Sequence, residues 1–391
     1  MPILVKPYLG CNLNCEYCYE TQHRKQHRPK MDYDIQAVLT AMEEQAKQRG
    51  KGAIFGLHGG EPLCMPKQDV EAIISKACEL SEKGCSVQTN ATLVDDDHIA
   101  MFKKYKIGSV GFSLDGPGEL SRFRMSSDQA DKIMALIHRL VEQEGLRVAV
   151  MCVLSKANVG TPELLSRLKT WLLELRQLEC GGSFNPCANS PRHQVDPEAL
   201  ADIMLDLAKF QMEHGMSWRP FIDMAMRVRG ETAVCSFMGC DIFHTPSCTV
   251  ILGDGAITNC MRTNQGDITL MHPAKYNTRD DILQEIPQEN GGCRGCEFWE
   301  PCHGGCPMMA IDDDWRNRTY MCPVRKKLLS FYTNVTRSLK IPVGEEANNR
   351  IWKGHPGHID TGQTGHTDIA RPGHQDNHRD YPPRGSRKGA C

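Results

Sequence analysis

Short apolar runs alternate with longer amphipathic segments from Ile3 to about Cys187, and this alternation constrains the fold most. Apolar residues three and four positions apart mark the longer segments as helices, and several begin with Asp or Thr-Pro, which cap helix N-termini. Strands are predicted at residues 3–6, 53–57, 86–88, 109–113, 148–154 and 182–185, and helices at 34–48, 68–82, 95–105, 128–144, 162–179 and 197–213. Six β/α units predict an α/β fold whose parallel sheet curves into a partial (β/α)6 barrel, with its chemistry at the C-terminal ends of the strands.

The amino-acid composition of the chain changes after residue 215. From Cys235 to Cys322 the chain is rich in cysteine and glycine, with short strand-like pieces such as 249–252 and a last helix at 323–339. A region with so few long helices and strands needs another source of stability, which bound metal clusters can supply. Residues 341–391 are rich in Gly, Pro, His, Asp and Arg and predict a disordered tail, whose repeated Gly-His-x-Asp could also bind divalent metal. Three parts follow: 1–215, 216–340 and 341–391.

Charge and cysteine content narrow the class of protein. The formal net charge of -2 gives no reason to expect a nucleic-acid partner. No apolar run approaches the roughly 20 residues that cross a bilayer, and the N-terminus does not resemble a signal peptide. We therefore expect a cytoplasmic protein without a membrane partner. In that reducing compartment 19 cysteines indicate metal or redox chemistry rather than disulfides.

Three cysteines follow the first predicted strand with the spacing Cys11-x3-Cys15-x2-Cys18. Three thiolates can hold three irons of a four-iron cluster, which leaves one iron open to a small molecule. The same spacing also suits a zinc knuckle or scattered thiols, so the triad alone does not distinguish a four-iron cluster from these alternatives.

The residues resemble the radical S-adenosylmethionine (SAM) superfamily, whose Cys-x3-Cys-x2-Cys has an aromatic before its third cysteine, here Tyr17. Three further motifs that resemble those of the superfamily follow successive predicted strands: Gly59-Gly60-Glu61-Pro62, Gln88-Thr89-Asn90 with Ala91 in place of the family's glycine, and Ser113-Leu114-Asp115-Gly116. The resemblance implies that Cys11, Cys15 and Cys18 hold the catalytic cluster and that SAM is bound by Tyr17, Gly59, Gly60, Glu61, Pro62, Asn90, Ser113 and Asp115. Glycine carbonyls and a carboxylate suit its ammonium group. Arg124 is either a surface arginine or the partner of the cofactor carboxylate.

A second cysteine pattern near the C-terminus resembles the SPASM extension of radical SAM enzymes, which houses two auxiliary four-iron clusters. The resemblance implies that one cluster is held by Cys293, Cys296, Cys302 and Cys322, and the other by Cys260, Cys306, Cys240 and Cys248, with Cys235 as an alternative. With the first cluster, three four-iron clusters are expected. Zinc is the rival for any group of four thiolates.

SPASM relatives mostly modify ribosomally made peptides, so the resemblance implies a peptide or protein substrate and an electron donor such as flavodoxin or ferredoxin. In the anaerobic sulfatase-maturing relatives an Asp base follows the cysteine that Cys260 matches, whereas Met261 follows here. Methionine cannot accept a proton, which favours a thioether or carbon-carbon crosslink over sulfatase-type oxidation. Peptide epimerisation stays open, with Cys187 or Cys391 as the hydrogen donor. A non-catalytic iron-sulfur scaffold would not explain the strand-end motifs.

Overall fold

The computed structural model describes residues 3–20, 33–231, 248–258, 260 and 279–339. Within these ranges the strands form one sheet in the order β7-β6-β5-β4-β3-β2-β1-β8-β9, parallel except for the antiparallel β8–β9 pair. They are β1 Ile3–Lys6, β2 Phe55–Leu57, β3 Cys85–Thr89, β4 Ser109–Ser113, β5 Val148–Leu154, β6 Gly181–Pro186, β7 Trp218–Arg219, β8 Thr249–Leu252 and β9 Ile257–Thr258. The predicted parallel α/β fold is confirmed.

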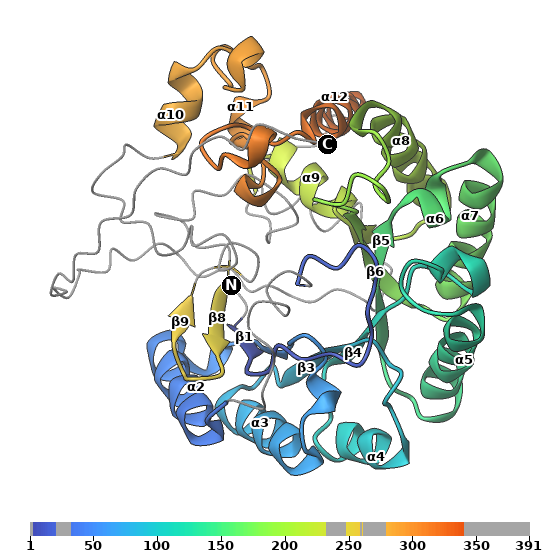
Figure 1. The fold of residues 1–391 in the computed structure, drawn as a ribbon, viewed down its shortest axis with the longest axis vertical. Coiled ribbons are helices and arrows are strands. Elements are labelled where there is room, and N and C mark those ends of the chain that lie inside the picture. The colour runs from blue at the N-terminus through green and yellow to red at the C-terminus, as the bar shows by residue number, and fades with distance from the viewer. Residues whose placement is uncertain (1–2, 21–32, 232–247, 259, 261–278, 340–391) are drawn as a thin grey trace, which may run out of the picture. The chain divides into compact units, whose positions relative to one another are not determined.

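Helices surround the curved sheet on its outer side (Figure 1). They are α2 Ile35–Arg49, α3 Lys67–Leu80, α4 Asp96–Lys104, α5 Ser127–His138, α6 Lys156–Val159, α7 Pro162–Gln177, α8 Pro197–Glu213, α9 Phe221–Val228, α10 Arg279–Glu285, α11 Trp299–Cys302 and α12 Cys322–Ser338. The expected caps are present: the side chains of Asp34, Asp95, Thr161 and Asp196 accept backbone N–H groups at the starts of α2, α4, α7 and α8. Local sequence therefore determines where these helices begin.

The strands present two different faces. In β5 every second side chain, from Val148 to Leu154, is buried, while those between are partly exposed. β3 repeats the pattern, with Gln88 partly exposed between buried neighbours. The buried set packs under the outer helices, and the other set faces the inside of the barrel. There the amide of Gln88 donates to Ser113 Oγ at 2.9 Å, which joins the ends of β3 and β4.

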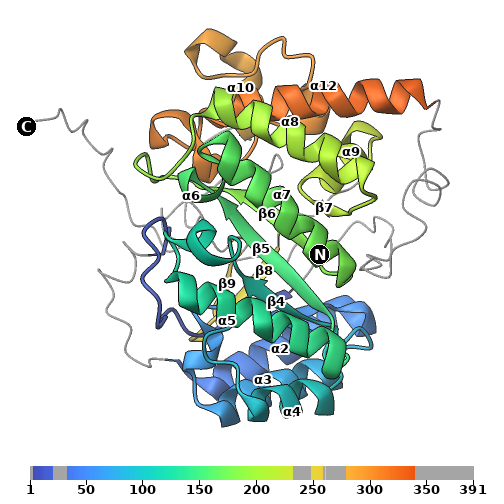
Figure 2. The same cartoon turned by 90° about the vertical axis from the view of Figure 1, so that its right-hand side faces the viewer.

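The sheet continues past residue 215, where the sequence predicts a boundary. β8 pairs in parallel with β1, and Ile3 lies opposite Thr249. The strand predicted at 249–252 thus belongs to the same sheet as the six β/α units. At the other end of the chain α12 packs on α8 and α9 (Figure 2). The functional division at 215 stays a prediction.

Two further expectations concern the chain as a whole. In the described segments no helix combines the length and the apolar character that a membrane span needs. The tail at 341–391 lies outside the described residues.

Candidate functional site

The loop after β1 carries the three N-terminal cysteines, all partly buried. Cys18 N donates to Cys15 O at 3.1 Å, which turns the loop back on itself. Burial raises the pKa of Cys15 to about 11; Arg124 opposes this rise, while Cys18, Asp115 and Cys11 add to it. The three thiols therefore lie within electrostatic reach of one another.

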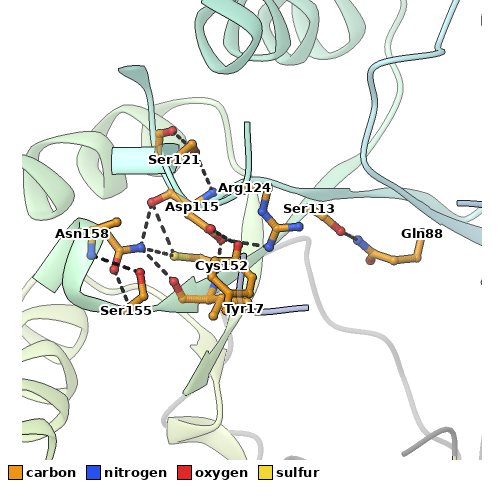
Figure 3. A network of polar contacts seen from close by, with 12 residues as sticks. Tyr17, Gln88, Ser113, Asp115, Ser121, Arg124, Cys152, Ser155 and Asn158 are labelled. Carbon is orange, nitrogen blue, oxygen red and sulfur yellow. Dashed lines mark hydrogen bonds and ion pairs between the residues drawn. The ribbon is translucent and has the colours of Figure 1, made fainter. Parts of the chain in front are cut away.

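Asp115, which follows β4, anchors this loop. Its carboxylate accepts hydrogen bonds from Tyr17 Oη, from Arg124 Nη2 at 2.9 Å and from Val153 N at 2.8 Å. The side chain is only 1% exposed, and its carbonyl accepts from Asn158 Nδ2 at 3.0 Å (Figure 3). Asp115 thus ties the cysteine loop to the ends of β4 and β5. Arg124, expected at the surface or on the cofactor, pairs with Asp115, while its Nε is buried without a hydrogen-bond partner in the described structure.

The Gly-Gly-Glu-Pro segment after β2 lies against the backbone just before Cys11. Gly60 N donates to Tyr8 O at 2.9 Å, and Glu61 N donates to Gly10 O at 2.7 Å. A Cβ added to Gly60 would come within 2.2 Å of Leu9 O. Glycine is therefore required here by the close approach of two backbones.

Glu61 connects the glycine segment to the end of β3. Its buried carboxylate accepts from Thr89 Oγ1 at 2.7 Å, Asn90 N at 2.6 Å and Leu63 N at 3.0 Å. Both oxygens are thus engaged inside the protein, where they join the end of β3 to the short 3-10 helix that begins at Pro62. The glycine carbonyls remain the groups suited to an ammonium.

Asn90 connects the end of β3 to the cysteine loop. Its Nδ2 donates to Asn12 Oδ1 at 2.8 Å and lies 3.7 Å from Cys11 Sγ. The next residue, Ala91, has φ +68°, a left-handed conformation that favours glycine. Glycine stands at this position in the resembled motif, so the backbone shape of that motif is kept although the residue differs.

A buried polar group lies beside β1 and β2. Lys6 and Glu20, both almost fully buried, form an ion pair. His58 Nδ1 accepts from Gly59 N at 3.0 Å. Burial, with the Lys6 charge, lowers the pKa of His58 to about 4. His58 is therefore neutral at neutral pH, and its ring orientation is fixed by the glycine segment.

Four of the C-terminal cysteines line one cavity: Cys293, Cys296, Cys302 and Cys322. Burial, together with the other three thiols, raises the pKa of Cys293 to about 12, and the charge of Arg279 opposes this rise. Across the described ranges no three His, Cys, Asp or Glu side chains converge tightly enough for a single metal ion. The four thiols predicted as one auxiliary ligand set thus line a common cavity.

The cysteine-rich loops are also held by one buried cation. Arg279 donates to the carbonyl oxygens of Trp315 at 2.7 Å, Asn317 at 2.9 Å and Gly305 at 3.0 Å. The sequence predicts that bound metal clusters can stabilise this region. The guanidinium of Arg279 adds to that stability, because it joins α10 to two loop segments, 303–305 and 315–317, through neutral acceptors.

The second predicted auxiliary set is described only in part. Cys248 precedes β8, Cys260 follows β9, and Cys306 is buried outside the lining of the four-cysteine cavity. Cys240, Cys235 and Met261 lie outside the described residues. The structure therefore brings together one auxiliary set and the twelve residues predicted for the N-terminal site.

Sequence reasoning missed Asn12, Asn158 and the backbone N–H of Val153. Asn158 had a usable signal, because Ser155 and Asn158 form a capping box directly after β5. Asn12 adjoins Cys11 and carries no signal beyond that position.

Known proteins resemble this chain in sequence and in fold. Residues 5–168 match the Radical SAM superfamily. The serine-type anaerobic sulfatase-maturating enzyme of Bacteroides thetaiotaomicron is 30% identical over 364 residues, which covers 78% of this chain and 82% of that protein. The chain belongs to the radical SAM superfamily. A protein of Archaeoglobus fulgidus is 35% identical over 340 residues, covering 83% of this chain and 79% of that protein. A match to a Methanothermobacter thermautotrophicus protein, 26% identical over 164 residues, covers 41% of this chain and 60% of that protein.

Solved radical SAM structures share the fold. The structure of anSMEcpe with bound AdoMet and the Kp18Cys peptide has a TM-score of 0.67 at 20% identity, covering 89% of this chain and 100% of that chain. Streptococcus suis SuiB bound to its precursor peptide SuiA has a TM-score of 0.56 at 16% identity, covering 82% and 75%. These solved structures therefore share the α/β fold of this chain over most of its length.

The residues present fit the cofactors that membership in the radical SAM superfamily implies, SAM and an iron-sulfur cluster. Three thiols on one loop leave a position open on a four-iron cluster. The buried Nε of Arg124 needs an acceptor, and the carboxylate of SAM is one.

Proposed function

We propose that this radical SAM enzyme is a peptide maturase, which uses a 5'-deoxyadenosyl radical to join two positions of a ribosomally synthesised peptide by a thioether or carbon-carbon bond. Support for the radical step comes from the strand-end motifs gathered around the cysteine loop. The observation that carries the crosslink is Met261, which stands where a catalytic Asp base would be needed for sulfatase-type oxidation.

Residues 1–215 would bind SAM and its cluster. When bound to Cys11, Cys15 and Cys18, the cluster supplies the electron that splits SAM into methionine and the radical. The carbonyls of Gly59 and Gly60 would accept hydrogen bonds from the SAM ammonium. Arg124, oriented by Asp115, would direct Nε to the SAM carboxylate.

Residues 216–340 would hold two auxiliary clusters. One takes Cys293, Cys296, Cys302 and Cys322, which line a common cavity. The other takes Cys260, Cys306, Cys240 and Cys248. When bound, these clusters would supply a site that accepts the electron released as the product forms. A one-electron donor such as flavodoxin or ferredoxin would reduce the first cluster, and the enzyme would act in the cytoplasm.

Side-chain oxidation of a sulfatase peptide is the second candidate, because the Bacteroides relative that bears that name is 30% identical over most of both chains. Its name alone does not transfer the reaction. A peptide epimerase is the third, and Cys187 is the described candidate donor. It follows β6, and burial raises its pKa to about 12, which keeps the thiol protonated for hydrogen donation.

The test is anaerobic incubation of reconstituted enzyme with SAM, a reductant and the peptide encoded beside its gene, followed by mass spectrometry. Loss of two hydrogens with missing fragment ions between the joined residues is the expected result. Loss of two hydrogens together with an aldehyde that reacts with a hydrazide would show side-chain oxidation rather than a crosslink. An unchanged mass in ordinary water, with deuterium uptake in heavy water, would show epimerisation rather than a crosslink. The Cys15→Ala variant controls for chemistry that does not need the radical.

A further inference from the structure

The cavity lined by Cys293, Cys296, Cys302 and Cys322 is also lined by cations, namely Arg318, Arg325 and Lys326. Four thiolates give any iron-sulfur core in this cavity a net negative charge, which becomes more negative on reduction. Buried positive charge close to such a cluster therefore stabilises its reduced form more than its oxidised form.

Arg325 makes the closest of these contacts. Its Nε donates to Cys302 Sγ at 3.0 Å, and its Nη2 lies 3.4 Å from Cys302 O. Arg325 is only 3% exposed. It lies in the first turn of α12, which begins at Cys322, so one helix turn carries a cluster ligand and the donor to another ligand. A hydrogen bond to a thiolate sulfur withdraws negative charge from it and makes an added electron less costly.

Arg318 supplies a second donor to the same cavity. Its Nε and Nη1 are buried and have no hydrogen-bond partner in the described part of the chain. Arg318 lines the cavity together with Cys322 and Lys326. A buried guanidinium without acceptors costs free energy, and the sulfur atoms of a cluster in the cavity would remove that cost.

We propose that Arg325, assisted by Arg318, is a positioning residue that raises the reduction potential of the cluster in this cavity and so makes it an electron acceptor. The inference rests on the ligand set in the proposed function. The cluster gains one electron when the product radical loses one, and a flavodoxin- or ferredoxin-type carrier removes it afterwards.

The test is an anaerobic redox titration of the reconstituted full-length chain, followed by electron paramagnetic resonance. A background with both Cys15→Ala and Cys260→Ala removes the signals of the other two proposed clusters. In Arg325→Gln we expect the ratio of reduced to oxidised cluster, at the parent midpoint potential, to fall about tenfold, or ~59 mV for one electron. Arg325→Lys keeps the charge but loses the donor geometry of Nε, so its shift is smaller. Arg318→Gln moves the potential in the same direction.

Arg227→Gln is the matched control. Arg227 Nη2 donates to Glu300 O at 3.1 Å and its Nε lies 3.4 Å from Pro301 O, next to Cys302 but not on a sulfur. Its loss should shift the potential least. An unchanged potential in Arg325→Gln at parental iron content would overturn the inference. If Arg325→Gln loses iron, unchanged reduction potentials in both Arg325→Lys and Arg318→Gln would overturn the inference instead. Equal iron content in Cys296→Ala and the parent would instead overturn the ligand set itself.

Discussion

The two cysteine sites differ in what surrounds their sulfur atoms. In the N-terminal loop the groups near Cys11 Sγ are neutral, the N–H of Leu13 at 3.4 Å and the amide of Asn90 at 3.7 Å. In the C-terminal cavity a buried guanidinium contacts Cys302 Sγ directly. Arg124, whose charge acts on Cys15, is paired with Asp115. This difference in charge agrees with the proposed roles, in which the first site gives electrons and the second takes them.

The largest expected effect is on cofactor cleavage. Cys15→Ala removes a ligand of the first cluster, so formation of 5'-deoxyadenosine should fall to the level without enzyme, as measured by chromatography. Cys78→Ala, which alters a thiol on α3 that contacts Tyr105 O, should keep it. Cleavage by Cys15→Ala would show that the radical starts elsewhere.

A ligand of the second site should separate cleavage from product formation. Cys296→Ala is expected to form 5'-deoxyadenosine at close to the parental rate but to yield no modified peptide, because the first site is intact and the acceptor is lost. Iron and zinc analysis should show less iron and no zinc in the variant. Loss of cofactor cleavage in this variant would contradict the division of labour.

The carboxylate that anchors the first site is expected to matter for stability. Asp115→Asn leaves the buried Arg124 without a counter-charge, which costs about 3–5 kcal/mol of unfolding free energy. Anaerobic denaturant unfolding measures it. Asp131→Asn is the control: that exposed carboxylate accepts one bond, from Gly118 N at 2.9 Å, and its loss should cost about 1 kcal/mol. Similar costs in both variants would mean that Asp115 is not the anchor.

Acid should destabilise the fold through His58. Its folded pKa of about 4 lies below that of the unfolded chain, so its contribution is present at neutral pH and is lost as pH falls from about 6.5 towards 4. His58→Gln should flatten the unfolding free energy across that range. His138 gives the opposite sign: Glu174 and Glu142 raise its pKa, so its smaller contribution is lost as pH rises. An unchanged acid slope in His58→Gln would assign the loss to other groups.

The smallest effect is expected at Ala91. Ala91→Gly relieves left-handed strain of about 1–2 kcal/mol, offset by about 0.4–1 kcal/mol of extra chain entropy in the unfolded state. Thermal unfolding should therefore show little change or a slight gain. Ala41→Gly, in the middle of α2, should lower the stability by about 1 kcal/mol. A comparable loss at Ala91 would mean that its methyl group contributes more than the strain costs.

Local signals in the sequence predicted the fold well where they were strong. β1, β4 and β5 have the predicted bounds, and α12 begins one residue before its prediction. The place of β8 beside β1 was not predictable, because pairing between distant segments leaves no local pattern. β7 was missed because two residues, Trp218 and Arg219, are too few to show alternation.

The candidate site was likewise predictable where the local signal was strong. Cysteine spacing indicated the cysteine sites, and the ends of the predicted strands indicated Gly60, Asn90 and Asp115. The partner that each side chain takes was not readable: the contacts of Glu61 with Thr89 and Asn90, which join the glycine segment to β3, leave no pattern in the sequence. The contact between Arg325 and Cys302 joins residues whose spacing matches no motif. Such pairings arise from packing, which only the folded chain determines.

The pairing of β1 with β8 also sets an order for biogenesis. During synthesis β1 can pair with β2 early, but its other edge stays uncovered until Thr249–Leu252 has left the ribosome. Contacts between distant segments form late. The strand that leads into the Cys11–Cys18 loop is therefore completed only when much of the cysteine-rich region is about to emerge. Iron delivery to the first site and to the second is thus expected to occur in one late window, after translation has passed the barrel.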